Sequence, residues 1–278
     1  MKSKTSLGIL GVLGIWITAG LALPFVNVLK RFTPEQLMVF RGFMTAGMAL
    51  IGLRGIIGKV DKFTWLIALT LPFATLGLFE GIRHWGAGPT IIVITTTPLV
   101  NLIISLFLKR KIRRASVIGL VLMLGGVALA RRGGAWQWQG FAWTVFGTIM
   151  NGILYEFLAR AEASSLQKCF YACVSMGVLG SVLSVRSDWS ATSEPKFLAL
   201  LLGFAFIGGF LYWISNLLAF KNLPTAEAGI LAQGETPSVI LGAYFLLGER
   251  MTLMQWIGVC ISLFGAWYLT RWLKKESG

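Results

Sequence analysis

The feature that most constrains this chain is a series of long apolar stretches separated by short polar turns. Ten stretches occur in 278 residues, near 6–29, 34–53, 64–82, 89–108, 115–130, 140–158, 167–185, 197–219, 226–247 and 252–270. Each is close to the ~20 residues that a helix needs to cross the hydrocarbon core of a bilayer. Gly and Pro in the intervening turns are typical of helix ends. The spacing predicts an all-α membrane protein of ten transmembrane helices, with no room for a soluble domain.

Composition supports a membrane protein and excludes several other classes. The chain is 56% hydrophobic and only 13% charged, whereas soluble domains carry about 25% charged residues. The net charge of +14 would otherwise suggest a nucleic-acid partner, but membrane proteins gather Lys and Arg on their cytoplasmic loops. We therefore expect a lipid bilayer and no nucleic acid as partner. With three scattered cysteines and one histidine, we expect no metal site and no cofactor.

The basic residues also predict the orientation in the membrane. With ten helices, the termini and every second loop lie on one side, and that side receives sixteen of the 25 Lys and Arg residues. The opposite side receives eight, and Arg41 alone lies within a stretch. Because positive charge marks the cytoplasmic side, both termini are predicted to be cytoplasmic.

The chain resembles itself at an offset of 139 residues, half its length. Between 87–132 and 226–271, twelve of 46 positions are identical without a gap, including Thr97-Pro98 and Thr236-Pro237. The loop 109–114 carries five basic residues, whereas its equivalent 248–253 carries one. Equivalent loops with opposite charge bias belong on opposite sides of the membrane. We therefore predict two inverted five-helix repeats, 1–134 and 135–278, around a central cavity, an architecture used for alternating access.

Motifs in the second half carry a family resemblance. They are Thr236-Pro237, Gly248-Glu249-Arg250, Gln255-Trp256-Ile257-Gly258 and Leu263-Phe264-Gly265. They resemble the Pro, Gly-Glu, Gln-x-x-Gly and Gly sequence of the EamA-type, ten-helix branch of the drug/metabolite transporter superfamily. The first half keeps Pro98, Gly119 and Gly126 but has Lys109-Arg110 in place of Gly-Glu. Within the branch the chain is most similar to amino acid exporters of the YddG type.

Two proline-interrupted stretches in corresponding positions predict where a substrate binds. Pro98 and Pro237 lie near the middle of 89–108 and 226–247, and each frees the carbonyl four residues earlier. The polar residues just before the prolines, Thr95, Thr97 and Gln233 among them, are candidates to bind substrate. The alternative is that the threonines bind the freed carbonyls of their own kinked helix. Pro24 is a third candidate for a kink or gate.

Two carboxylates within stretches are sharper candidates. A carboxylate at mid-depth costs about 2.5–3.5 kcal/mol on insertion scales, so Glu235 is expected to face a cavity or a partner. It can bind a substrate ammonium, relay a proton, or pair structurally with Arg41. Glu80 lies near the outer end of its helix, and its alternative role is to pair with Arg83 or His84.

Other polar and aromatic side chains within the stretches supply the hydrogen bonds and apolar wall that an amino acid needs. The further candidates for substrate binding are Trp16, Asn101, Asn151, Tyr155, Trp213 and Asn216.

The resemblance implies an inner-membrane secondary transporter of a bacterium that exports aromatic and other neutral amino acids and related metabolites. Exporters of other metabolites or of cationic drugs in the same superfamily are the alternative, and a structural or receptor-like membrane protein is a third hypothesis. A membrane-embedded enzyme is disfavoured because His84 is the single histidine, no Asp lies within a stretch, and no Gly-rich phosphate loop occurs. A monomer is expected.

Overall fold

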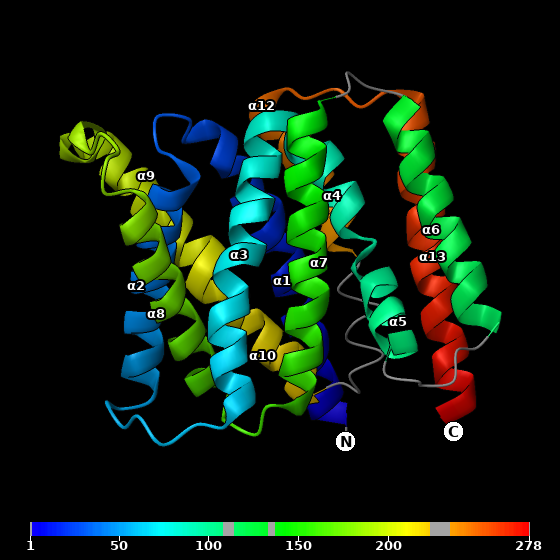
Figure 1. Ribbon diagram of the computed structural model, residues 1–278, viewed down its shortest axis with the longest axis horizontal. Helices are drawn as coiled ribbons and strands as arrows, with labels where there is room; N and C mark the ends of the chain where they lie inside the picture. The colour runs from blue at the N-terminus through cyan, green and yellow to red at the C-terminus, as the bar shows by residue number, and fades with distance from the viewer. Residues whose placement is uncertain (1, 108–113, 133–136, 223–233, 278) are drawn as a thin grey trace.

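The protein folds into a bundle of helices joined by short loops (Figure 1). This computed structural model describes residues 2–107, 114–132, 137–222 and 234–277. The elements are α1 (Lys2–Val28), α2 (Pro34–Gly52), α3 (Lys62–Trp85), α4 (Ala87–Ile94), α5 (Thr97–Phe107), α6 (Arg114–Arg132), α7 (Trp138–Arg160), α8 (Ser165–Leu183), the 3-10 helix η1 (Ser190–Ser193), α9 (Pro195–Ala205), the π-helix η2 (Phe206–Leu211), α10 (Tyr212–Asn222), α12 (Glu235–Leu247) and α13 (Leu253–Ser277).

Helices lie where the ten apolar stretches predicted them. The fourth stretch contains α4 and α5, the eighth contains α9, η2 and α10, and the ninth contains α12, with 226–233 outside the described residues. Four helical segments are long and apolar enough to cross a membrane by length and composition, namely Ser6–Val28, Lys62–Trp85, Ser165–Leu183 and Pro195–Asn216. For the residues that the structure describes, the prediction of an all-helical membrane protein is therefore confirmed.

The helix ends follow from local side-chain chemistry. Thr33 begins α2 with a capping box, because its hydroxyl accepts from the Gln36 N–H while the Gln36 side chain accepts from the Thr33 N–H. Ser164 and Gln167 do the same at the start of α8. Gly248 ends α12 with a φ of 67°, a left-handed conformation that glycine adopts without strain.

Asp61 caps the start of α3 and also binds the loop between α7 and α8. Its Oδ1 accepts from the backbone N–H groups of Phe63 and Thr64, at 2.8 and 3.2 Å. Its Oδ2 accepts from the Thr64 hydroxyl at 2.9 Å, and from the backbone N–H groups of Glu162 and Ala163 at 3.1 and 3.2 Å. Desolvation opposes ionisation, but the hydrogen bonds outweigh it and lower the pKa of Asp61 from 3.8 to about 2.

We expect Asp61→Ala to lower the melting temperature of the detergent-solubilised protein at pH 7 by roughly 2–4 °C, since a helix cap and a loop anchor are both lost. Because the folded-state pKa is depressed, the stabilisation by ionised Asp61 is present above pH ~4 and is lost as the pH falls towards 2. The difference between wild type and variant should therefore narrow over that window in thermal unfolding scans. Glu162→Ala, which keeps the backbone donor, is the control; an equal loss in both variants would contradict the role of the Asp61 carboxylate.

Adjacent helices come from distant parts of the chain. The closest-packed pairs are α3 with α7, α2 with α8, α6 with α13, and α1 with both α10 and α12. Helix α1 begins and α13 ends at the same end of the bundle, here called the termini side (Figure 1). Glycines allow some of these close approaches: a Cβ on Gly77 of α3 would lie 2.6 Å from the backbone of Gly147 of α7.

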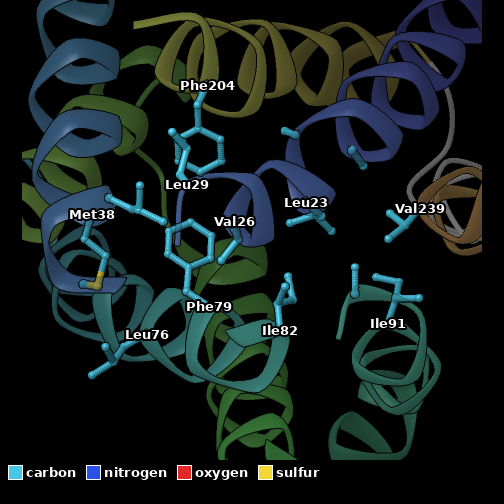
Figure 2. Packing of buried hydrophobic residues seen from close by; sticks show 14 of the residues in the cluster. Leu23, Val26, Leu29, Met38, Leu76, Phe79, Ile82, Ile91, Phe204 and Val239 are labelled. Atoms are coloured by element: carbon cyan, nitrogen blue, oxygen red, sulfur yellow. The ribbon is translucent and has the colours of Figure 1, made fainter. Parts of the chain in front are cut away.

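Most of the main hydrophobic core lies in the half of the bundle away from the termini side, here called the far half, and Ala49 and Cys169 extend it towards the termini side. Met38, Phe79 and Phe204 come from α2, α3 and α9, Leu29 directly follows α1, and each is less than 3% exposed (Figure 2). The rings of Phe79 and Phe204 lie 5.7 Å apart between centroids. In a bilayer such a core is stabilised by van der Waals packing, because lipid tails are as apolar as the side chains. The far half is therefore closely packed.

Two spans are interrupted. The fourth predicted span breaks at Thr95 and Thr96, between α4 and α5, immediately before Pro98. In the eighth, the six residues of η2 form a π-helix around Gly208 and Gly209. A π-helix holds one more residue than the α-helical turn it replaces, and such turns are frequent at functional sites. Sequence patterning predicted the first interruption and not the second.

Candidate functional site

Glu235 is the centre of the candidate site. It lies in the first turn of α12, where the backbone N–H groups favour a negative charge. Its Oε2 accepts a hydrogen bond of 3.3 Å from the Tyr212 hydroxyl. Tyr212 is the first residue of α10, directly after the π-helix η2, so the interrupted span aims this hydroxyl at the carboxylate.

Trp16 of α1 lies against the residue before Glu235. A Cβ on Gly234, the residue before Glu235, would overlap the indole of Trp16. Trp16 and Tyr212 also pack against the same small cluster of buried residues, Val12 and Ile15 of α1 and Ala219 of α10. The phenol thus contacts the carboxylate, and the indole lies beside the residue that precedes it.

Arg41 of α2 supplies a positive charge to the same region. Its guanidinium lies over the ring of Phe79, with Cζ 5.6 Å from the centroid, and is within electrostatic range of Glu235 and Tyr212. Within the described part of the chain Arg41 and Glu235 make no ion-pair contact of 4.0 Å or less, and the buried Arg41 Nε has no hydrogen-bond partner. The structural pairing of these two charges, which the sequence left open, is therefore not a contact ion pair.

Helix α7 brings two further predicted residues to one face, because Asn151 and Tyr155 are four residues apart. Tyr155 is 47% exposed and yet lies within electrostatic range of Glu235. Trp213 packs on the main core, and the Asn216 amide donates a 2.8 Å hydrogen bond to the Tyr212 carbonyl. The Asn216 side chain thus binds a backbone carbonyl of its own helix, α10.

The predicted threonines bind their own helix. The Thr95 hydroxyl donates to the Ile92 carbonyl at 2.5 Å, and the Thr97 hydroxyl donates to the Ile94 carbonyl at 2.7 Å. Ile94 is the carbonyl that Pro98 frees, so the structure has the alternative arrangement that the sequence left open.

The other predicted residues are placed apart from Glu235 or are not described. Glu80 pairs with His84 at 3.3 Å on α3, as its alternative role predicted. Pro24 is buried in α1, where Cγ would lie 3.2 Å from a Cβ on Gly242 of α12. Gln233 and the side chains of Asn101, Pro98 and Pro237 lie outside the described residues.

Sequence reasoning did not assign Glu249 a physical role. Its carboxylate accepts a 3.4 Å hydrogen bond from the Gly88 N–H at the start of α4 and a 3.2 Å bond from the Asn27 amide of α1. A carboxylate there complements the positive end of the helix dipole of α4. The Gly-Glu motif thus fastens the loop after α12 to α1 and α4 at the far end of the bundle. Gly86 and Gly248, which lie next to these contacts, have a positive φ, and this backbone geometry is visible only in the structure.

Two shallow surface hollows lie away from this cluster. One is lined by apolar residues of α6 and α13, among them Trp256 and Phe264, and the other by residues of α7, among them Trp138 and Trp143. Both have almost entirely apolar linings and carry no charged side chain. They suit lipid chains better than a polar ligand. The central cavity stays a prediction.

A bundle of apolar helices with charged side chains gathered between interrupted spans is the arrangement of a membrane transporter. The sequence profile of the EamA-like transporter family matches residues 6–132 and again 138–271. The chain therefore belongs to the EamA-like transporter family of the drug/metabolite transporter superfamily, whose members are transporters and not enzymes.

Individual relatives add the fold but no substrate. An uncharacterised protein, y4nH of Sinorhizobium fredii (strain NBRC 101917 / NGR234), is 29% identical over 103 residues, which cover 34% of this chain and 88% of the relative. A solved structure described as "Crystal structure of protein" matches over 100% of both chains, with a TM-score of 0.65 and 15% sequence identity. That likeness concerns the fold alone.

Proposed function

We propose that this protein is a secondary transporter that exports amino acids and related small metabolites from the bacterial cytoplasm by alternating access. The observation that carries the proposal is Glu235, a carboxylate in the middle of the bundle with Tyr212 as its hydrogen-bond donor and Trp16 beside it. A carboxylate at mid-depth binds a substrate ammonium or a proton, and the indole offers an apolar wall to a side chain.

Within this proposal the chain crosses the inner membrane ten times as two inverted repeats, 1–134 and 135–278, with cytoplasmic termini. The two matches of the family profile support two repeats. The helix packing supports their equivalence: α1 packs on α10 and α12, and α7, its counterpart five spans later, packs on α3, α4 and α5. Each repeat thus inserts its first helix between the third and fourth spans of the other.

Alternating access requires one end of the pathway to close while the other opens. The tightly packed far half, with Phe79 and Phe204 at its centre, supports a closed outer end. Tyr155 lies towards the termini side of α7, and its exposure near Glu235 supports a route from that side to the carboxylate. Substrate therefore enters from the termini side in this conformation, and rocking of the repeats carries it outwards.

Export of cationic drugs or other metabolites by the same site is the second candidate. It is favoured by a carboxylate with the Tyr212 ring in contact and the Trp16 ring beside the preceding residue, since aromatic rings also stabilise organic cations. The presence of Arg41 beside Glu235 favours a substrate that also bears a negative charge.

Uptake into proteoliposomes tests the proposal. The purified protein is reconstituted and given a labelled panel of neutral amino acids, sugars and quaternary ammonium drugs, with and without a pH gradient. We expect saturable uptake of phenylalanine and other neutral amino acids above that of protein-free liposomes. A sugar-only or drug-only profile would overturn the amino acid assignment, and no flux of any compound would favour a structural or receptor-like protein.

A further inference from the structure

We propose that Arg41 binds the carboxylate of the substrate while Glu235 binds its ammonium, so that the site selects zwitterionic α-amino acids over amines and over acids. This inference rests on the proposed function and gives it a second binding residue, from a helix that the sequence analysis did not assign to the site.

The first observation is that Arg41 is a half-buried cation with no hydrogen-bond acceptor among the described residues. The described residues give its guanidinium no hydrogen bond, and its Nε is fully buried. Guanidinium groups within membrane proteins pair with carboxylates or carbonyls, because a buried, unpaired charge is costly. The face of the Phe79 ring, 5.6 Å from Cζ, stabilises the charge only in part.

The groups around Arg41 explain why it stays unpaired. Cys169 and Cys173 of α8 and Tyr212 of α10 are within electrostatic range, but thiols and a phenol are weak acceptors for a guanidinium. Gly209 of η2 packs on the aliphatic part of Arg41, since a Cβ there would lie 3.3 Å from its Cγ. The packing therefore holds the base of the side chain, and none of the described anionic groups contacts its charged head.

The second observation is the opposite charge across the same space. Glu235 interacts electrostatically with Arg41, but among the described residues it accepts its hydrogen bond from Tyr212. Because the two opposite charges attract each other without touching, one ligand that bears both charges can contact each of them. An α-amino acid carries a carboxylate and an ammonium on one carbon, and its carboxylate matches the forked donors of a guanidinium.

The third observation is that buried polar side-chain atoms without a hydrogen-bond partner lie close together on α2. Three buried side-chain polar atoms lack a partner in the described part of the chain, and two of them, Arg41 Nε and Thr45 Oγ1, lie one turn apart on α2. Both face η2, because a Cβ on Gly209 would also overlap the Thr45 hydroxyl. Buried polar groups are nearly always satisfied, so a local pair of exceptions points to a missing ligand.

Competition assays in proteoliposomes test the selection with three compounds that share one aromatic side chain. They are phenylalanine, 2-phenylethylamine, which lacks the carboxylate, and 3-phenylpropionate, which lacks the ammonium. In the wild type we expect both analogues to inhibit labelled phenylalanine uptake about 10–100-fold more weakly than phenylalanine itself, because each leaves one buried charge unmatched.

Arg41→Gln should raise the KM for phenylalanine about 10–100-fold and bring the amine to within a few-fold of phenylalanine. Glu235→Gln should instead favour the acid. Arg41→Lys keeps the charge without the fork and should give an intermediate ratio. Arg160→Gln, which breaks a surface ion pair with Glu156 at the end of α7, is the matched control and should leave all ratios unchanged.

The outcomes separate this inference from the proposed function. If the wild type carries phenylalanine and Arg41→Gln weakens all three compounds equally, Arg41 is structural and the inference fails while the function stands. Equal inhibition by amine and zwitterion in the wild type overturns it too, even if the Arg41 variants do not fold. If the wild type moves no amino acid, both fall.

Discussion

Replacing Glu235 with glutamine is expected to abolish uphill transport in proteoliposomes while leaving substrate exchange. Under a proton-coupled mechanism, the carboxylate takes up a proton in exchange for the substrate ammonium, and glutamine cannot be protonated in its place. The amide oxygen still accepts a hydrogen bond from Tyr212 and from an ammonium, so exchange should remain within about tenfold of the wild type. Accumulation driven by a pH gradient should fall to the level without a gradient.

The measurement is counterflow and gradient-driven uptake of labelled phenylalanine by the same vesicles. Glu194→Gln is the control, because Glu194 is an exposed carboxylate that pairs with Arg31 at 2.8 Å, outside the site. If Glu235→Gln transports normally with and without a pH gradient, Glu235 is structural and the coupling idea fails.

Gly42→Leu is expected to destabilise the native bundle strongly. Gly42 of α2 faces α8, where a Cβ would lie 2.5 Å from the Gly177 nitrogen and 2.7 Å from the Cys173 carbonyl oxygen. Both neighbours are backbone atoms of a helix and cannot rotate away, so the helices must separate. Overpacking of this kind costs about 3 kcal/mol or more, and the melting temperature should fall by about 6–12 °C.

Gly47→Leu is the matched control for Gly42→Leu, because it adds the same side chain to the same helix. A Cβ on Gly47 meets nothing within 4 Å, and leucine favours helix more than glycine does. Its elution profile in size-exclusion chromatography should match that of the wild type. Its melting temperature should be equal to or higher than that of the wild type. Equal behaviour of the two variants would mean that α2 and α8 do not pack as described.

The helices were predictable because a bilayer imposes one length on every span. Runs of apolar residues with Gly and Pro at their ends set the boundaries of α1, α2 and α3 to within a few residues, with no knowledge of packing. The break at Thr95 was also predictable, because Pro98 and three consecutive threonines are local signals. Such features depend on neighbours in the chain.

The parts of the site that depend on packing were not predictable. Glu235 was a candidate from its charge alone, but its contact with Tyr212 joins residues from different helices. Arg41 was considered only as a structural pair for Glu235, and that it lacks such a contact follows from how α2 meets α3, α8 and η2. Glu80 was taken as a candidate on the same reasoning as Glu235, and it pairs with His84 on its own helix. A charged residue within an apolar span can be recognised from the sequence, but its role depends on the side chains that pack around it.

The π-helix η2 sets the direction in which α10 presents its side chains. One residue turns an α-helix by about 100°, so a single added residue at Phe206–Leu211 rotates everything that follows by about that angle. Had the span been α-helical throughout, the Tyr212 hydroxyl would point away from Glu235. The geometry of the site therefore depends partly on the number of residues in the eighth span. A one-residue insertion or deletion in η2 would rotate α10 without replacing any residue of the site.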